Sequence, residues 1–347
     1  MRMPDLSRRD FVCRLMASGT LSFVVGCRTG EGGAGEGSFR FDVLNPDFMV
    51  GGAGQCVVMR TPGGKTYLYD TANGDFMGEK RKNNGKDIVV PWLNAHGIEK
   101  IDGLVISHYH ADHFGGLLWM WDHFPIEKIY NNNYTPDFTG LTEHDVMEYK
   151  IARKCLDDWG RTHPGCLVEN TKAGDDLGWN EPDVTFDVVW PPREGYVKPL
   201  ANRKDYTAGD NHFHHLLNGN STALRITAGG RVFFILGDIQ PDYARTYMRP
   251  LMERQGTWGC DIAVLPSHGT VPHEMVKDVN AMQPRPKTVI ASLGNQKWML
   301  EVGRSVKRIY GAAGYEAYAT SLDGDVSCDR RGEVSTDETR TYPHDPK

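Results

Sequence analysis

Cysteine is scarce in this chain: seven occur in 347 residues, and no two are spaced as Cys-X-X-Cys. This small number of cysteines and their spacing exclude a fold held together by several disulfides, and they exclude a zinc knuckle. Long apolar runs are also absent, since no internal segment reaches the roughly 20 apolar residues that span a bilayer. Acidic residues exceed basic ones by 45 to 39, and the resulting net charge of −6 argues against broad electrostatic binding of nucleic acid.

The N-terminal segment differs in kind from the rest of the chain. Residues 7–12, Ser-Arg-Arg-Asp-Phe-Val, resemble a twin-arginine export signal, and a short apolar stretch over 15–26 follows. The stretch leads into Val-Val-Gly-Cys, which resembles the lipobox of bacterial lipoproteins and marks Cys27 for lipidation. Residues 28–38 are rich in glycine and are typical of a flexible tether.

We therefore expect an export signal over 1–26, and a lipidated Cys27 with its Gly-rich tether over 27–38. Loss of residues 1–26 removes four arginines and two aspartates, which changes the net charge from −6 to about −8. The expected location is the bacterial cell envelope, in the periplasm or on the outer surface, with the membrane contacted only through the lipid anchor. The alternative is a disordered tail that happens to contain an arginine pair.

The most informative run is Ser-His-Tyr-His-Ala-Asp-His-Phe-Gly-Gly over 107–116. It places His108, His110, Asp112 and His113 directly after an apolar strand expected over 101–106. Imidazole and carboxylate are the ligands that hold zinc or a similar ion. Extended backbone puts His108 and His110 on one side, and a turn through Ala111 can bring Asp112 and His113 to a second ion. The alternative is a polar loop with solvated histidines.

The remaining sequence predicts alternating strands and helices. We expect strands over 39–44, 55–61, 65–70, 127–130, 183–190, 221–228, 231–237, 260–265, 287–292, 315–320, 325–329 and 332–337. We expect helices over 87–97, 114–122, 143–160, 241–254, 272–281 and 295–310. We expect an inserted, mobile loop over 197–219 and a polar tail over 338–347. Four tryptophans are candidates for a substrate groove, although core or rim packing is favoured: Trp119, Trp121, Trp179 and Trp190.

Two further strand ends offer ligands at the same edge of such an α/β layer. Asp238 follows the apolar run 232–236, and a carboxylate there suits a bridge between two cations, although it also suits a helix cap. His268 follows the apolar strand after Asp261. Each of these signals is weak alone. Three strand ends that deliver ligands to one edge are much more specific.

Together these motifs resemble the metallo-β-lactamase superfamily, and more closely the hydrolase domain of ComEC-type competence proteins. The resemblance covers residues 39–337 and implies an α/β (α+β) fold, a four-layer αββα sandwich. It implies that His108 and His110 hold a first metal, that Asp112, His113 and His268 hold a second, and that Asp238 bridges them. Asp70 would support these ligands from behind. The implied cofactor is Zn²⁺, one ion or two, with Mn²⁺ or Fe as further options.

The chain departs from the family pattern at two positions. The first metal usually has a third histidine, and the candidates here for a third ligand or a substrate contact are His212, His214, His215 and Asn220. A surface histidine cluster is the alternative. Ser267 stands where the family often has a second histidine. Whether one or two metals bind therefore stays open.

The predicted function is hydrolysis by a metal-activated water, with Asp112 as the residue that orients the nucleophile and accepts its proton. The resemblance favours a phosphodiester or related ester, from a small molecule, a nucleotide or a nucleic acid. A basic segment over 80–86 could contact phosphates, although a solvated turn is favoured. Two alternatives remain: iron-dependent thiol or oxygen chemistry on the same fold, and a non-catalytic, metal-stabilised surface binding protein.

Overall fold

The computed structural model describes residues 37–46, 54–74, 83–139, 141–143, 146–200 and 210–338. The expected export signal, Cys27 and the tether up to residue 36 lie outside these ranges, and so do Lys80, Arg81 and Lys82 of the basic segment. Within the described part, no helix combines the length and apolar character needed to cross a bilayer.

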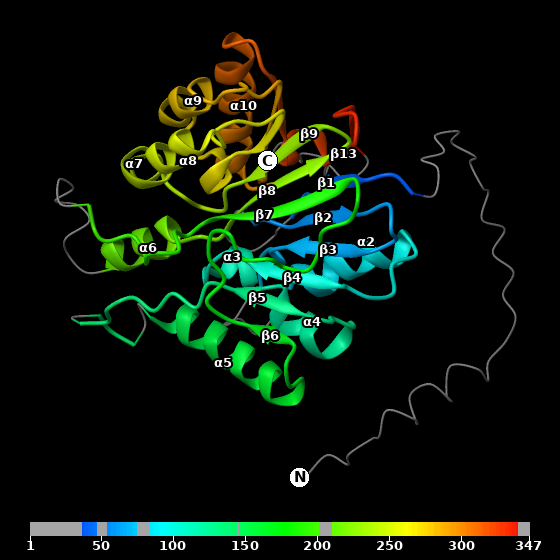
Figure 1. Cartoon of the computed structure of the whole chain (residues 1–347), viewed down its shortest axis with the longest axis vertical. Coiled ribbons are helices and arrows are strands. Elements are labelled where there is room, and N and C mark those ends of the chain that lie inside the picture. The colour runs from blue at the N-terminus through cyan, green and yellow to red at the C-terminus, as the bar shows by residue number, and fades with distance from the viewer. Residues whose placement is uncertain are drawn as a thin grey trace, which may run out of the picture. The chain divides into compact units, whose positions relative to one another are not determined.

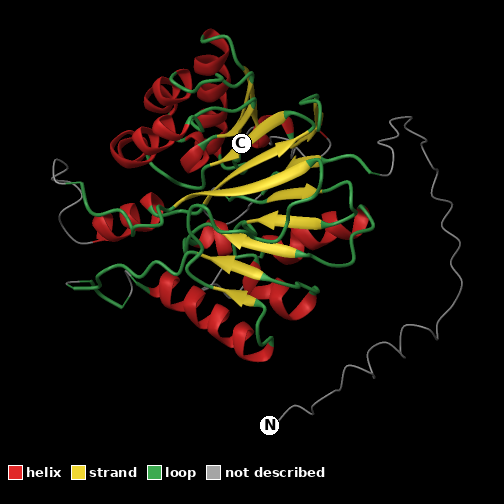
Figure 2. Cartoon of the chain, in the orientation of Figure 1, coloured by secondary structure: helices red, strands yellow, loops and turns green. Residues whose placement is uncertain are grey.

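Successive strand residues point into two separate apolar clusters. Val57 and Met59 belong to the cluster between the sheets, whereas Val58 between them belongs to the cluster under the helices. Phe41 of one sheet meets Phe233 of the other with ring centroids 4.9 Å apart. Because side chains alternate across a strand, each sheet buries both faces, one against the other sheet and one against helices. This arrangement is the expected four-layer sandwich, and the fold prediction is confirmed (Figure 2).

The first sheet has eight strands in the order β14-β13-β1-β2-β3-β4-β5-β6. The run β3 to β6 is parallel, and the other neighbours pair antiparallel. Its strands are β1 (Arg40–Val43), β2 (Val57–Arg60), β3 (Thr66–Tyr69), β4 (Gly103–Ile106), β5 (Ile129–Asn131), β6 (Leu167–Val168), β13 (Asp325–Asp329) and β14 (Val334–Asp337).

The second sheet has six strands in the order β12-β11-β10-β9-β8-β7. The run β9 to β12 is parallel, and β7, β8 and β9 pair antiparallel. Its strands are β7 (Val184–Trp190), β8 (Ala223–Ala228), β9 (Arg231–Ile235), β10 (Ile262–Val264), β11 (Thr288–Ala291) and β12 (Glu316–Ala319).

Helices cover the outer faces of both sheets (Figure 1). Figure 1 shows α4 and α5 beside the first sheet and α8 to α10 beside the second. The helical segments are η1 (Gly85–Val89), α2 (Val90–Ala95), α3 (Ala111–Phe114), α4 (Leu117–His123), α5 (Met147–Thr162), α6 (Asp210–Gly219), α7 (Pro241–Tyr243), η3 (Ala244–Met248), α8 (Arg249–Gln255), η4 (Pro266–Gly269), α9 (Pro272–Asn280), α10 (Lys297–Ala312) and α11 (Thr320–Asp323).

Most predicted elements are present, and a few differ. The expected loop over 197–219 is wrong for residues 210–219, because Asp210–Gly219 forms helix α6, and residues 201–209 lie outside the described part. The expected helix over 114–122 is divided into α3 and α4 at Gly115 and Gly116. Two of the four tryptophans, Trp179 and Trp190, are buried in the core, so they line no groove.

Candidate metal centre

The histidine run changes backbone conformation where it leaves β4. His110 is extended, with φ −81° and ψ 146°, and it caps α3. The helical turn then brings Asp112 and His113 back toward the end of the strand. His113 is fully buried and His108 is 2% exposed. One short segment therefore presents these side chains from two directions.

Glycine contacts hold this turn against the loop that follows β3. A Cβ added at Gly116 would lie 2.0 Å from the carbonyl oxygen of Thr71, so only glycine fits there. The backbone N–H of Thr71 donates to the carbonyl of His113 at 2.7 Å, and the Gly116 N–H donates to the carbonyl of Ala72 at 3.0 Å. The backbone of His113 is thereby fixed by a loop about 40 residues earlier in the chain.

Three side chains, one from each of three strand ends, converge around His113. Its Nε2 lies 3.2 Å from Nε2 of His268, 3.3 Å from Oδ1 of Asp238 and 3.9 Å from Oδ1 of Asp112. His268 Nε2 lies 3.3 Å from Asp112 Oδ2 and 3.5 Å from Asp238 Oδ1. A tetrahedral site with ligand bonds of about 2.0–2.1 Å has edges of about 3.3 Å. Four of these five separations are close to those edges, and the His113–Asp112 separation is longer.

The hydrogen bonds of the two imidazoles show what this group can hold. Nδ1 of His268 lies 3.0 Å from the carbonyl oxygen of Ser292, and Nδ1 of His113 lies 2.7 Å from Oδ2 of Asp70. Both partners accept, so both Nδ1 atoms donate, and in neutral rings both Nε2 atoms carry lone pairs. Two lone pairs facing each other at 3.2 Å need a cation between them. Oδ1 of Asp238 also has no hydrogen-bond donor.

Without a metal, protons bound to the imidazoles take the place of a cation between the two Nε2 atoms. Burial disfavours charge on His113, but the carboxylates of Asp238 and Asp70 outweigh burial and raise its pKa well above the usual value. The pKa of His268 is raised for the same reason, by Asp238 and Asp112 against burial. The pKa of Asp238 is held low, because His268 and His113 outweigh its desolvation. The donor set therefore fits a divalent cation.

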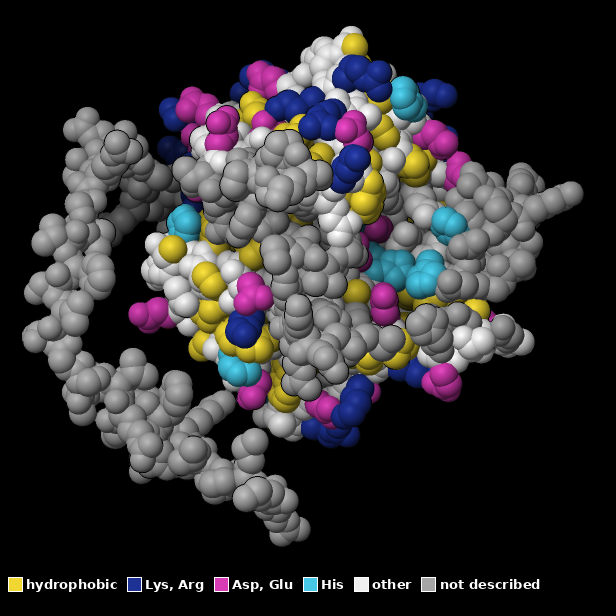
Figure 3. Space-filling model, turned by 180° about the vertical axis from the view of Figure 1, so that it is seen from behind, with side chains coloured by type: hydrophobic (Ala, Val, Ile, Leu, Met, Phe, Trp, Pro, Cys, Tyr) yellow, Lys and Arg dark blue, Asp and Glu magenta, His cyan; other side chains and the backbone are white. Residues whose placement is uncertain are grey.

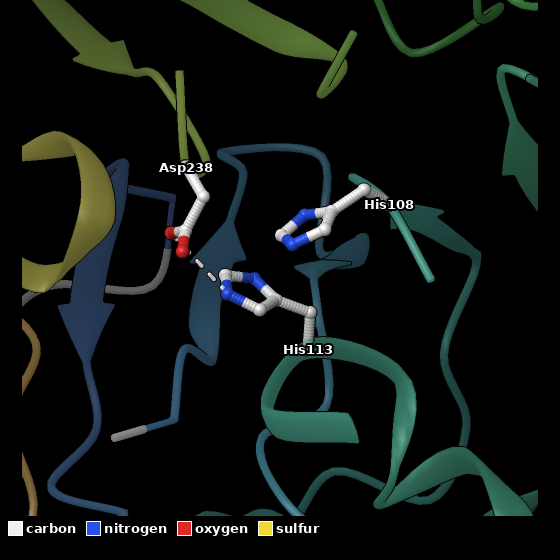
Figure 4. A group of neighbouring side chains, drawn as sticks. All are labelled: His108, His113 and Asp238. Atoms are coloured by element: carbon white, nitrogen blue, oxygen red, sulfur yellow. Dashed lines mark ion pairs between the residues drawn. The ribbon is translucent and has the colours of Figure 1, made fainter. Parts of the chain in front are cut away.

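A second set of imidazoles adjoins the first. His108 lies with His113 and Asp238 in a group whose ligand atoms are all within 4.8 Å of one another (Figure 4). His108 Nε2 lies 2.9 Å from His110 Nδ1, and His110 Nε2 lies 2.7 Å from His214 Nδ1. Burial lowers the pKa of His108, and burial with the nearby His214 lowers the pKa of His110 to about 4. Both rings are thus neutral, as metal ligands must be.

The four tentative positions separate in the structure. His214, on α6, meets His110, whereas His215 Nδ1 lies 2.6 Å from Gln240 Oε1. The side chain of His212 lies outside the described residues. Asn220 uses its amide on backbone groups of Val197 and Leu216, so it holds a loop rather than pointing a free oxygen at the centre. Of these four, His214 lies closest to the predicted ligands in the described contacts.

Serines connect the ligand loops through hydrogen bonds, a role that the motifs in the sequence did not predict. Ser107 donates from its N–H and Oγ to the carboxylate of Asp70 and meets His108 Nδ1 at 2.9 Å. Ser221 Oγ lies 3.2 Å from the same nitrogen. Ser267 donates from Oγ to the Asp238 carbonyl, which joins two ligand loops. A polar residue directly after an apolar strand, as at position 107, is the signal that marks Ser107.

Backbone strain gathers at this edge of the sheets. Asp70, Ser267 and His268 are non-glycine residues with φ of 59°, 45° and 54°. The left-handed region is unfavourable for residues with a Cβ and persists where the surroundings require it. In each case the strained residue turns the chain at a strand end, so the strain is tied to the presentation of the buried polar side chains.

A pocket of about 460 Å³ opens next to the centre. Its lining includes Asp112, Asp238 and His268 from the ligand set. The space-filling view shows histidine and acidic side chains gathered in a hollow of this face (Figure 3). Small-molecule sites commonly have volumes of about 300–1,000 Å³, so the pocket can admit a substrate to the ligand atoms.

Comparison with known proteins places the chain among relatives that are much longer. It is 24% identical over 255 residues to the competence protein ComA of Neisseria gonorrhoeae, which covers 73% of this chain and 29% of that protein. It is 20% identical over 252 residues to ComE operon protein 3 of Bacillus subtilis strain 168, with 73% and 27% covered. The chain thus spans less than a third of the length of these two relatives.

Comparison with solved structures gives more distant matches. A CmlA β-hydroxylase E377D mutant matches with a TM-score of 0.47 and 17% identity, over 82% of this chain and 53% of that one. Tm1679, described as a metal-dependent hydrolase of the β-lactamase superfamily, matches with a TM-score of 0.43 and 14% identity, over 81% and 94%.

A family model matches most of the chain. The match runs over residues 49–290, which include β2 to β11 and the candidate ligands from His108 to His268. The limits of 39–337 that we expect for the domain stay a prediction. The homology to competence proteins that the motifs suggested is confirmed. The chain belongs to the metallo-β-lactamase superfamily.

Proposed function

We propose that this protein is a metal-dependent hydrolase that uses an activated water on a phosphodiester or related ester. The observation that carries the proposal is the group formed by His113, His268, Asp238 and Asp112. It has the separations of a metal coordination shell, and it borders a pocket. Divalent cations in this set would supply Lewis acidity and lower the pKa of a bound water.

Asp112 is the residue best placed to accept the proton of the nucleophile. Its side chain is 26% exposed and reaches the pocket, whereas that of Asp238 is 11% exposed. Burial would raise the pKa of Asp112, but His113 and His268 outweigh it and lower that pKa, so the carboxylate is ionised near neutral pH. An ionised carboxylate beside the water position can orient the water and take its proton.

The hydrogen-bond partners of the two imidazoles position these rings and transfer no proton to or from the substrate. Asp70 and the Ser292 carbonyl hold the rings of His113 and His268 so that each Nε2 points to the shared space. The choice of a phosphodiester is supported by the homology to competence proteins and rests on analogy. Zinc is the ion that we propose, with manganese or iron as the alternatives.

The test begins with metal analysis of the purified protein. Protein stripped with a chelator is then reloaded separately with Zn²⁺, Mn²⁺ or Fe²⁺ and assayed on bis(p-nitrophenyl) phosphate. We expect metal-dependent turnover, and we expect Asp112→Asn to lower kcat/KM by at least about 10²-fold. The matched control is Asp122→Asn, since Asp122 is an exposed carboxylate on α4.

Three results would contradict the proposal. If Asp122→Asn lost as much activity as Asp112→Asn, Asp112 would not be the residue that accepts the proton of the nucleophile. Iron as the sole bound metal, with no ester turnover, would favour thiol or oxygen chemistry. Metal binding that stabilises the protein, without turnover on any phosphodiester, phosphomonoester, thioester or lactam, would favour a binding protein.

A further inference from the structure

Two large apolar side chains are exposed beside the candidate centre. Among the described residues, Trp298 and Val271 are the large hydrophobic side chains with high exposure, at 50% and 41%. Both line the same 460 Å³ pocket as Asp238 and His268. Scattered exposed apolar residues need no explanation, but a pair confined to the mouth of a ligand pocket is typical of a binding surface.

The positions of these residues couple them to the ligand loops. Val271 follows Thr270, which donates from Oγ1 to the carbonyl of Ser267 next to His268. Trp298 lies in the first turn of α10, and its indole N–H already donates to Gln296 Oε1 at 2.7 Å. With that donor used, the indole offers the pocket apolar aromatic surface. Such surface binds planar aromatic groups by stacking.

The negative charges around the pocket limit the number of phosphate groups that a substrate can carry. Its described lining contains Asp242 and Glu274 besides the ligand carboxylates, and it contains no lysine or arginine. Arg245 is not among the lining residues. Its Nη1 lies 3.8 Å from Asp242 Oδ1 and 4.0 Å from Glu274 Oε2, whereas its closest ion pair is with Asp278, at 2.8 Å. A chain of phosphates would meet these carboxylates beyond the metal centre. A single phosphoester avoids this repulsion.

We propose that Trp298 and Val271 form a subsite for a planar aromatic group carried by a small phosphodiester with one phosphate. The group stacks on Trp298 while the phosphate lies at the ligand cluster. A nucleobase and a simple aryl ring share this chemistry. The inference rests on the proposed function for the phosphate position, and it narrows the substrate class from esters in general to small aromatic diesters.

The first test separates the aromatic group from the reaction. Metal-loaded protein is assayed on a thymidine ester, thymidine 5′-(methyl phosphate), and on a methyl ester without a ring, dimethyl phosphate. Both carry one negative charge and release methanol, which is measured. We expect Trp298→Ala to lower kcat/KM for the thymidine ester about tenfold, mainly through KM, and to change the methyl ester less than about twofold. Trp298→Phe should retain most of the difference. Equal losses on both esters, or no loss, would overturn the subsite.

A binding measurement separates failure of the subsite from failure of the proposed function. Calorimetry on the metal-loaded protein compares thymidine 5′-monophosphate, phenyl phosphate and methyl phosphate. Weaker binding of the first two alone in Trp298→Ala supports the subsite even if no ester is hydrolysed. A difference between thymidine and phenyl compounds identifies the preferred ring. Unchanged binding of thymidine 5′-monophosphate and phenyl phosphate, with ester hydrolysis intact, would overturn the subsite and leave the proposed hydrolase function standing.

The limit to one phosphate has its own test. An oligothymidylate bound more than about tenfold tighter than the monophosphate would overturn the single-phosphate limit.

Discussion

The carboxylate of Asp70 and the imidazole of His113 lie 2.7 Å apart, and both side chains are fully buried. They are 43 residues apart in sequence and come from the ends of the neighbouring parallel strands β3 and β4. Burial raises the pKa of Asp70, while His113 opposes that rise. The pair fixes which nitrogen of His113 is available for a cation, so the chemistry of the centre depends on a residue that need not touch the metal.

Replacing Asp70 should weaken metal binding. In Asp70→Asn the oxygen that accepts from His113 can remain, but the negative charge that favours a cation on His113 is lost. We expect metal affinity to fall about 10- to 100-fold. Competition with a chromophoric chelator measures it, and Asp122→Asn is the control. Unchanged affinity would mean that Asp70 serves folding only.

Removing His268 should change metal content. His268→Ala deletes one member of the group around His113 and leaves Asp112 and Asp238 with one neighbouring imidazole, that of His113, in place of two. Elemental analysis should show about one metal equivalent less than in the native protein. His123→Ala, an exposed histidine on α4, should keep the native content. Equal metal content in both variants would remove His268 from the ligand set.

Metal affinity should rise with pH. Because neighbouring carboxylates raise the pKa values of His113 and His268, these rings hold protons in the metal-free protein near neutrality. A metal must displace those protons, so acid weakens binding, and the dependence levels off above the raised pKa values. Calorimetry in buffers of different ionisation enthalpy should reveal proton release. A binding enthalpy independent of the buffer would refute this expectation.

Glycine 116 should resist substitution. Gly116→Ala places a methyl group against the Thr71 carbonyl, and the adjustment should cost about 1–3 kcal/mol of unfolding free energy. Gly311, on α10, has open space around its Cβ position. Gly311→Ala should therefore stabilise the protein by up to about 1 kcal/mol. Urea unfolding measures the unfolding free energy of both variants. Equal changes in that free energy would contradict the close contact at Gly116.

We propose that the full-length protein is exported and anchored through lipid on Cys27. The support is the order of arginine pair, apolar stretch, lipobox-like sequence and glycine-rich tether. In a bacterial host, Cys27→Ala should move the protein from the membrane fraction to the soluble fraction. Cys13→Ala should have no such effect, because Cys13 lies before the expected cleavage site. Fractionation with immunodetection tests this, and a native protein found only in the cytoplasm would refute it.

The sequence by itself determined the elements and the kind of site. The apolar strands 101–106 and 260–265 are followed within three residues by histidine, and 231–237 is followed by Asp238. These local patterns predicted the ligand types, and their resemblance to a known superfamily predicted the fold. These patterns can be recognised in the sequence because strand alternation and the spacing of His108, His110, Asp112 and His113 depend only on residues that are close along the chain.

The tertiary structure alone decided how these residues meet. It showed that part of the predicted loop is helix α6, that His214 on it reaches His110, and that Asn220 is used on the backbone. It also brought Trp298 to the pocket of His268. The physical reason is that the contacts within the centre join distant segments: His110 and His214 are 104 residues apart, and His113 and His268 are 155 residues apart. Local secondary-structure propensity does not predict such long-range contacts, because they depend on the packing of the two sheets against each other.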